Sequence, residues 1–252
     1  MTTASRVLIL GGTGEARHLA ARLAERPEIE AIASLAGRTQ QPNPLAIPMR
    51  VGGFGGVAGL VAYLQTQQIA ALIDATHPFA AQISHHAATA AAKTGIPHLQ
   101  LVRPAWQPVT GDRWLAADSH ATAAALLPGL ATRIFLSIGR QELAAFAHLR
   151  QLWFLMRAIE PPPPEQPQPP GQLLLQRGPF TLAAERSLLQ SHRIEAIVSK
   201  NSGGEATVAK LIAARELGLP VVMVQRPPLP PGERVAEVEG AIAWLQATLG
   251  CG

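Results

Sequence analysis

The chain has 252 residues and a mass of 26.6 kDa, which is enough for one large domain or two of ordinary size. Hydrophobic residues make up 48% of the chain and charged residues 15%, a balance that excludes an intrinsically disordered protein. The net charge is +4, but most basic residues are single arginines that form no run or helical stripe, which argues against a nucleic-acid partner. A small anionic ligand explains these arginines at least as well as a solvated basic surface does, because a guanidinium fork binds phosphates and carboxylates.

The sequence carries no signal for secretion or membrane insertion, and we expect a cytoplasmic protein. Its single cysteine, Cys251, excludes a disulfide framework and a thiolate metal site. The first apolar run ends at Gly11, too early for a signal peptide. The uncharged stretch 51–73 has the length of a membrane helix, but its glycines and glutamines argue against insertion. The oligomeric state stays open, with a monomer favoured.

The first predicted strand leads into a glycine-rich turn. An apolar run at 7–10 is followed by Gly11, Gly12, Thr13 and Gly14 and then by a helical pattern from Glu15. Such a turn lets the backbone approach a pyrophosphate, and the helix N-terminus attracts its negative charge. The complete G-x-G-x-x-G motif is absent, since Arg17 holds the last glycine position, so a turn without a ligand stays an alternative.

Short apolar runs then alternate with amphipathic patterns along the whole chain, which predicts parallel sheets covered by helices on both faces. Further strands are expected at 29–36, 49–51, 70–74, 98–102, 114–116, 133–138, 153–159, 173–176, 196–200 and 221–224. Helices are expected at 15–25, 57–67, 79–93, 119–127, 140–149, 181–191, 205–217 and 235–249. The proline-rich stretch 161–170 is predicted to be a surface loop, with a partner-binding tract as the alternative.

The pattern weakens after residue 103 and divides the chain into two halves. We expect an N-terminal dinucleotide-binding Rossmann-like domain at 1–103 and a C-terminal α/β domain at 104–252. Both are three-layer domains with mainly parallel sheets, and we expect the ligands to bind in a cleft between them.

Polar and glycine residues follow five of the predicted strands, where parallel sheets bind their ligands. The first three clusters predict the cofactor site, made of Gly11, Gly12, Thr13, Gly14, Glu15, Ser34, Gly37, Arg38, Asp74 and Thr76. The last two predict a substrate site, made of Ser137, Gly139, Arg140, Asn201, Ser202 and Gly203. Lys200 to Gly204 is an anion-binding arrangement that suits either a substrate carboxylate or a cofactor phosphate.

The end of the second strand indicates NADPH as the cofactor. NAD-binding domains place an acidic residue there for the ribose hydroxyls, whereas this chain has Arg38, which suits a 2′-phosphate. His77 is a candidate general acid or hydrogen-bond donor. The pair His85 and His86 has no acidic or sulfur partner at metal-binding spacing, so we expect no metal site.

Two related enzyme classes are excluded by missing residues. Short-chain dehydrogenases need a tyrosine with a lysine four residues later, and the single tyrosine, Tyr63, has Gln67 at that position. A Walker loop is absent because neither glycine-rich turn is followed by Gly-Lys-Ser/Thr.

The chain resembles the precorrin-6A reductase family of corrin (vitamin B12) biosynthesis, which includes cobalt-precorrin-6A reductases. The resemblance runs nearly end to end and is carried by Ile9 to Ala16, Ser34 to Arg38, Asp74-Ala75-Thr76-His77-Pro78-Phe79-Ala80 and Ser199 to Gly204. It implies a two-domain α/β oxidoreductase that uses NADPH to reduce one double bond of precorrin-6A, or of its cobalt form, to precorrin-6B. His77 and Lys200 are the candidate proton donors, with bound water as a third possibility.

Two alternatives stay open at this point. The protein could be a nucleotide-sensing regulator that binds NADP without turnover. It could also reduce another small unsaturated acid, such as a dihydrodipicolinate-like imine.

Overall fold

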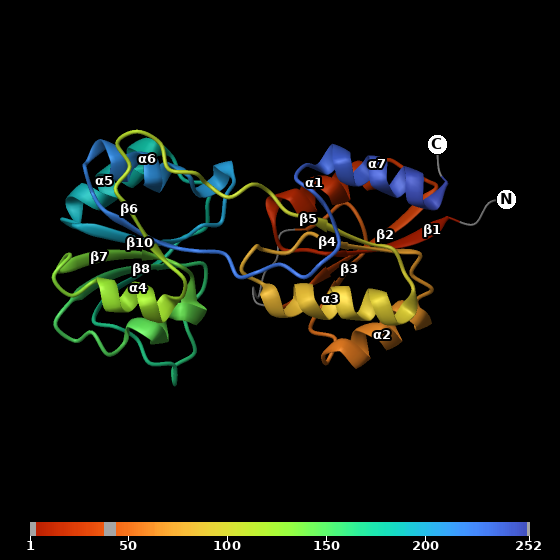
Figure 1. Ribbon diagram of the computed structural model, residues 1–252, viewed down its shortest axis with the longest axis horizontal. Coiled ribbons are helices and arrows are strands. Elements are labelled where there is room, and N and C mark those ends of the chain that lie inside the picture. Colours follow the sequence, from red (N-terminus) through yellow and green to blue (C-terminus); the bar gives the residue numbers. More distant parts are fainter. Residues whose placement is uncertain (1–3, 38–43, 251–252) are drawn as a thin grey trace. The chain divides into compact units, whose positions relative to one another are not determined.

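The chain forms two compact units in the computed structural model, which describes residues 4–37 and 44–250 (Figure 1). The first unit takes in the described residues up to Pro104 together with those from Pro227 onward, and the second spans Ala105–Arg226. We expected one boundary after residue 103, with everything beyond it in the second domain. The structure differs because the chain returns to the first unit for its last strand and helix.

In the first unit, the described residues form a six-stranded sheet in the order β3-β2-β1-β4-β5-β12, with every pairing parallel. This is the 3-2-1-4-5-6 order of dinucleotide-binding Rossmann domains, with the sixth place filled from the far end of the chain. Its elements are β1 (Ser5–Leu10), α1 (Gly14–Leu23), β2 (Ile29–Leu35), β3 (Met49–Val51), α2 (Val57–Thr66), β4 (Ala71–Asp74), α3 (Ala81–Thr94), β5 (His98–Leu101), β12 (Glu233–Val235) and α7 (Val238–Leu249).

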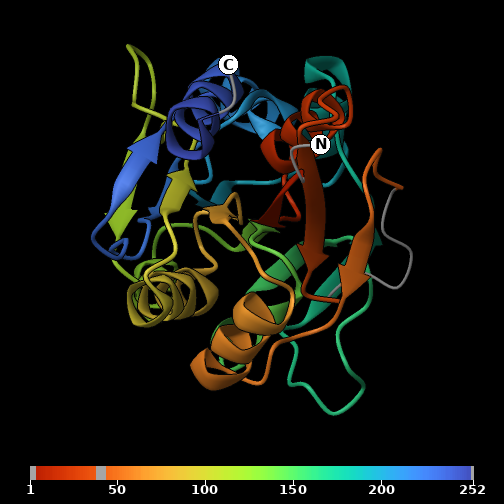
Figure 2. The ribbon, with the colours of Figure 1, turned by 90° about the vertical axis from the view of Figure 1, so that its right-hand side faces the viewer.

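Both faces of this sheet are buried under helices. Val7 and Ile9 of β1 join the core formed with α1 and α7, while Leu8 and Leu10 join the core formed with α2 and α3. Figures 1 and 2 show α1 and α7 on one side of the strands and α2 and α3 on the other. The continuous apolar run of β1 follows from this double cover, because successive side chains of a strand point to opposite faces.

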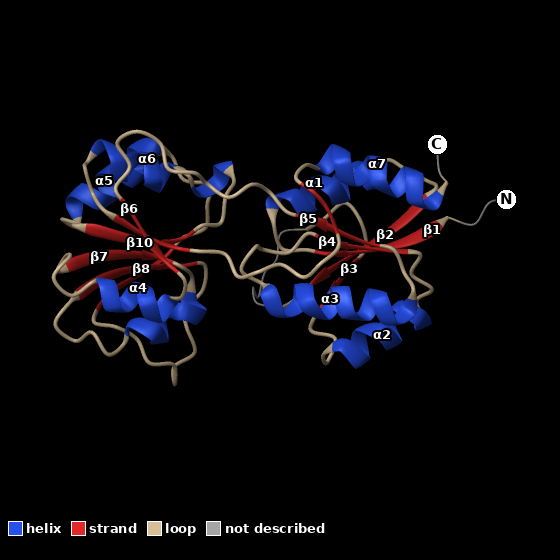
Figure 3. Ribbon diagram, in the orientation of Figure 1, coloured by secondary structure: helices blue, strands red, loops and turns tan. Residues whose placement is uncertain are grey.

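The described residues of the second unit form another six-stranded parallel sheet, in the order β9-β8-β7-β10-β11-β6. This is again the Rossmann order when counted from β7, but the sixth place is filled by β6, which comes before the other five. Its elements are β6 (Trp114–Ala117), α4 (His120–Leu126), β7 (Arg133–Ser137), the 3₁₀ helix η1 (Arg140–Phe146), β8 (Trp153–Ala158), β9 (Gly171–Leu175), α5 (Leu182–Ser191), β10 (Ala196–Lys200), the 3₁₀ turn η2 (Glu205–Thr207), α6 (Ala209–Glu216) and β11 (Val221–Val224). Helices α5 and α6 cover one face and α4 the other (Figure 3).

The structure confirms the α/β class and most of the predicted elements, with three local differences. The edge strand β12 was not predicted, the helix expected at 140–149 is the shorter 3₁₀ helix η1, and the helix expected at 205–217 is divided into η2 and α6. The proline-rich stretch 161–170 contains neither helix nor strand. The uncharged stretch 51–73 supplies α2 and parts of β3 and β4, and no helix within 4–37 and 44–250 is long and apolar enough to cross a membrane.

Candidate active site

Three glycines shape the turn after β1, each for a different reason. A Cβ on Gly11 would lie 3.3 Å from the Cβ of Ala16, so glycine is needed there for α1 to pack closely against the turn. Gly12 has a φ of +115°, which other residues rarely adopt. Gly14 is the first residue of α1, and a Cβ there would meet nothing within 4 Å. No neighbouring atom crowds Gly14, and the amides at a helix N-terminus attract an anion.

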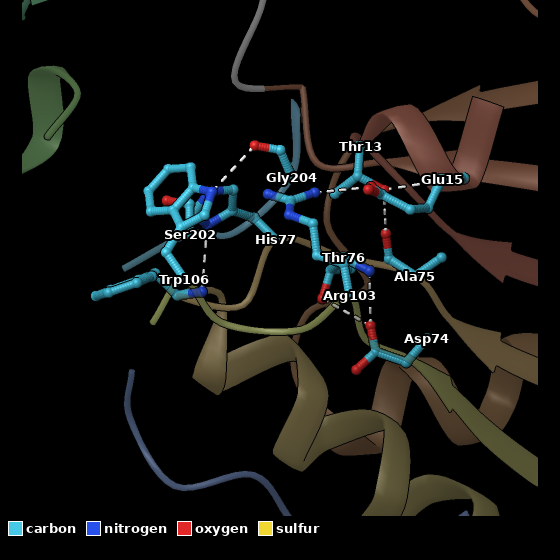
Figure 4. A network of polar contacts seen from close by, with 12 residues as sticks. Thr13, Glu15, Asp74, Ala75, Thr76, His77, Arg103, Trp106, Ser202 and Gly204 are labelled. Atoms are coloured by element: carbon cyan, nitrogen blue, oxygen red, sulfur yellow. Dashed lines mark hydrogen bonds and ion pairs between the residues drawn. The ribbon is translucent and has the colours of Figure 1, made fainter. Parts of the chain in front are cut away.

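Thr13 and Glu15 tie this turn to the neighbouring strand ends (Figure 4). Thr13 caps α1 by accepting a 3.1 Å hydrogen bond from the Ala16 amide, and its hydroxyl donates to the Ala75 carbonyl over 2.8 Å. Glu15 forms a 2.7 Å ion pair with Arg103, just beyond β5. Because Arg103 neutralises the carboxylate, Glu15 can occupy the first turn without repelling an anion bound there.

A second turn follows β4 and is organised by a buried carboxylate. Asp74 is only 3% exposed, and its Oδ1 accepts hydrogen bonds from the amide and the hydroxyl of Thr76, at 3.0 and 2.6 Å. His77 comes next, and its Nδ1 accepts a 3.2 Å hydrogen bond from the Phe79 amide. In the neutral ring the proton is therefore on Nε2.

At the end of β2, the side chain of Arg50 contacts Ser34, one of the residues that we predicted to bind the cofactor. Ser34 is buried, and its hydroxyl accepts a 2.7 Å hydrogen bond from Arg50, which also donates to the carbonyls of Gly52 and Gly53. The Arg50 guanidinium lies 4.0 Å from the centre of the Phe54 ring. Gly37 has a φ of +74°, as a turn glycine requires, while Arg38 lies outside the described residues.

In the second unit, three carbonyls of the loop that follows β10 accept hydrogen bonds from the side chains of Arg226 and Trp106. Arg226 donates to the carbonyls of Asn201 and Ser202, at 2.8 and 2.9 Å, and Trp106 Nε1 donates to the carbonyl of Gly204 over 3.2 Å. Gly203 and Gly204 have φ values of +68° and +82°, which residues other than glycine rarely adopt. These contacts fix the path of the loop, and its anion-binding role stays a prediction.

The side chain of Asn201, which we expected to contact substrate, pairs with the backbone of Trp106. Trp106 N donates to Asn201 Oδ1 over 2.9 Å, and Asn201 Nδ2 donates back to the Trp106 carbonyl over 3.1 Å. Because the buried amide group donates one hydrogen bond and accepts one in this pair, we assign the Asn201 side chain to shaping the loop.

The remaining predicted residues lie at neighbouring strand ends of the second sheet. Lys200 ends β10, and its Nζ is 3.2 Å from Oε1 of Glu142 in η1. Ser137 ends β7 and is half-buried, and Gly139 has a φ of +83°. Arg140 donates to the carbonyl of Pro161 over 2.8 Å, so it also anchors the start of the proline-rich loop.

Comparison with known proteins identifies the family. Residues 6–246 match the family model described as Precorrin-6x reductase CbiJ/CobK. The chain belongs to this family. A precorrin-6A reductase from Rhodococcus erythropolis is 56% identical to it over 242 residues, covering 96% of this chain and 97% of the relative. One from Rhodobacter capsulatus is 46% identical over 241 residues, covering 96% of each.

A solved structure of the same family, described as CobK precorrin-6A reductase, superimposes with a TM-score of 0.92 at 45% identity and covers 97% of each chain. As a member of this reductase family the protein is an oxidoreductase, and both the family resemblance and the α/β fold expected from the sequence are confirmed.

Three residues that the sequence analysis missed contact predicted site residues: Arg50, Trp106 and Glu142. Each acts through a tertiary contact, with Ser34, Asn201 and Lys200 respectively. A sequence signal exists for Arg50, since only Val51 separates it from the second glycine-rich turn at 52–56. Within the part of the chain that is described, no group of three or more His, Cys, Asp or Glu side chains could hold a metal ion.

Proposed function

We propose that this protein reduces one double bond of metal-free precorrin-6A, using NADPH, to give precorrin-6B. The observation that carries the proposal is the match to precorrin-6A reductases over nearly the full length of both chains. The first unit holds a glycine turn of the dinucleotide-binding type, and the second unit holds the loop that we predicted to bind an anion, which supports the proposal.

The residues of the first unit fit a dinucleotide. A Cβ on Gly14 would meet no atom within 4 Å, and the amides of the first helical turn have no carbonyl partner within the helix, so we assign the pyrophosphate to this helix end. The ion pair with Arg103 neutralises Glu15, so its carboxylate does not repel the phosphates. We assign the 2′-phosphate to Arg38, which distinguishes NADPH from NADH, and we assign to Arg50 the ordering of Ser34 and the adjacent glycine turn.

When bound, the reduced nicotinamide supplies the hydride to the macrocycle. The protein must then bind the acidic side arms, exclude water and deliver a proton to the adjacent carbon. We assign the side arms to the loop amides at Ser202 and Gly203, with Ser137, Gly139 and Arg140 beside them. We assign proton donation to the Lys200 ammonium. We assign to His77 a hydrogen bond from its Nε2–H to the ligand, because its Nδ1 accepts from the Phe79 amide.

Anaerobic incubation with precorrin-6A and NADPH tests the function. We expect loss of the nicotinamide absorbance together with a gain of two mass units in the pigment. Binding of NADP without turnover would instead favour the nucleotide-sensing alternative. Thermal protection by a compact dicarboxylate, without protection by the tetrapyrrole, would favour a reductase of another small acid. A parallel reaction with cobalt-precorrin-6A measures the preference for the metal-free ring.

A further inference from the structure

A cluster of three titratable side chains lies at the strand ends of the second sheet, and the proposed proton donor is one of them. Lys200 ends β10, Glu142 lies in the first turn of η1, and His120 opens α4. Lys200 Nζ is 3.2 Å from Glu142 Oε1, and His120 Nδ1 is 3.5 Å from Glu142 Oε2. The carboxylate therefore lies between the amine and the imidazole, with one oxygen directed to each.

The negative charge of Glu142 is available to Lys200 because His120 is neutral near pH 7. Burial lowers the pKa of His120, and the nearby Lys200 ammonium lowers it further against the opposing effect of Glu142. The Lys200 side chain is only 14% exposed, so solvent screens its attraction to Glu142 less than it would screen an exposed pair.

We propose that Glu142 is a positioning residue for Lys200, and that His120 supports Glu142 from the other side. The proposal rests on the proposed function, in which Lys200 donates the proton that accompanies hydride addition. In that step one Nζ–H bond breaks and one C–H bond forms on the macrocycle, and the neutral amine then takes a proton from water. Glu142 holds the ammonium in place before the step and favours its return afterwards, because a nearby opposite charge stabilises the charged form.

The composition of this chain allows a direct measurement. It has three lysines, Lys93, Lys200 and Lys210, so competitive acetylation at a series of pH values, read by peptide mass spectrometry, reports the pKa of each amine separately. We expect Glu142→Gln to lower the pKa of Lys200 by about one unit. Lys93 is exposed and serves as the internal reference. Glu216→Gln, which removes an ion pair with Arg186 between α6 and α5, is the matched control and leaves Lys200 unchanged.

The kinetic signature of a positioning role is a change in the pH profile. In E142Q, kcat falls at a lower pH than in the wild-type enzyme, the solvent isotope effect on kcat rises, and KM stays within about threefold of wild type. Glu142→Asp restores part of the alkaline range because it keeps the charge. Thermal unfolding of E142Q beside E216Q separates these effects from loss of the fold.

An unchanged pKa for Lys200 in E142Q would overturn the proposal, and so would a Lys200→Met variant with the wild-type kcat. Failure of the wild-type enzyme to consume NADPH with precorrin-6A is a different result, because it removes the proposed function. The acetylation experiment uses the free enzyme, so even then it decides whether Glu142 holds Lys200.

Discussion

The side-chain amide of Asn201 and the backbone of Trp106 exchange two hydrogen bonds, 2.9 and 3.1 Å long. The pair joins residues that are 95 positions apart in the sequence, and Asn201 is 5% exposed. A buried amide that donates and accepts at once fixes both the loop and the segment opposite it.

We expect Asn201→Ala to lower the free energy of unfolding by about 1–3 kcal/mol, because it leaves a backbone amide and a carbonyl of Trp106 without their partners. The KM for the tetrapyrrole should rise as the loop loosens. Denaturant unfolding and steady-state kinetics measure the two effects. Gln190→Ala, at an exposed position of α5, is the control and should stay within about 0.5 kcal/mol of wild type.

The Gly14→Ala variant separates cofactor binding from stability. Gly14 has space around it and lies in α1, so alanine should leave stability unchanged or raise it by up to about 1 kcal/mol. The added methyl group occupies the place proposed for the pyrophosphate, and we expect the Kd for NADPH to rise at least about tenfold, or 1.4 kcal/mol. Calorimetric titration and thermal unfolding check both halves. Unimpaired NADPH binding would mean that the phosphates lie elsewhere.

Two arginine variants distinguish recognition of the 2′-phosphate from ordering of the turn. Arg38→Ala should weaken NADPH by about 1.5–3 kcal/mol, the size of a charge-assisted contact, and NADH hardly at all. Arg50→Ala should weaken both cofactors alike, since its guanidinium is engaged with Ser34 and two carbonyls. Parallel titrations with NADPH and NADH decide the assignment. If Arg50→Ala weakened NADPH binding but not NADH binding, the 2′-phosphate would be assigned to Arg50.

The His77→Asn variant separates the role of His77 from that of Lys200. The Asn oxygen can still accept from the Phe79 amide, as Nδ1 does over 3.2 Å, but the Nε2–H is lost. We expect KM to rise about tenfold, as for one lost hydrogen bond, while kcat changes little. A fall in kcat of about 100-fold or more would instead identify His77 as the general acid.

Lys210 should make the stability of the protein depend on pH. Burial lowers the pKa of Lys210 to about 7, and its neighbour Glu185 is already paired with Arg157 at 2.8 Å. A lysine with a depressed pKa in the folded state destabilises the fold fully below about pH 7, and this effect fades as the pH rises and the amine becomes neutral. We therefore expect Lys210→Met to be most stabilising, relative to wild type, near pH 6, with the difference shrinking by up to about 1.4 kcal/mol per pH unit above pH 7.

Urea unfolding of wild type and Lys210→Met between pH 6 and pH 9 measures this difference. Lys93→Met, at an exposed position, should differ from wild type by the same amount at every pH. A pH-independent difference for Lys210→Met as well would show that the buried amine does not titrate in this range.

The predictable part of the fold came from local patterns. The run at 7–10 is apolar at every position because β1 is covered on both faces, and the glycines that follow mark the end of the strand. The strand-end loops are also visible in the sequence, because polar and glycine residues directly after a buried apolar run mark the carboxyl end of a strand, where such sheets bind ligands.

The missing part depends on contacts between distant segments. Glu233-Arg234-Val235 has no strand pattern of its own, and it becomes β12 only by pairing with β5 from Leu99 to Leu101. That long-range pairing also explains why the end of the chain was assigned to the wrong half. In the site, Glu142 and Trp106 have no local signature either, because their significance lies in the residues they meet.

The placement of β12 and α7 has a consequence for synthesis on the ribosome. The first unit needs residues from both ends of the chain, so its early strands emerge long before the sixth strand and the last helix exist. Until residues 233–249 have been translated, the edge of β5 has no neighbour on that side, and the surface that later meets Ile242 and Leu245 is without its cover. Truncations that remove β12 and α7 should therefore behave as folding defects of the first unit, although most of that unit is translated first.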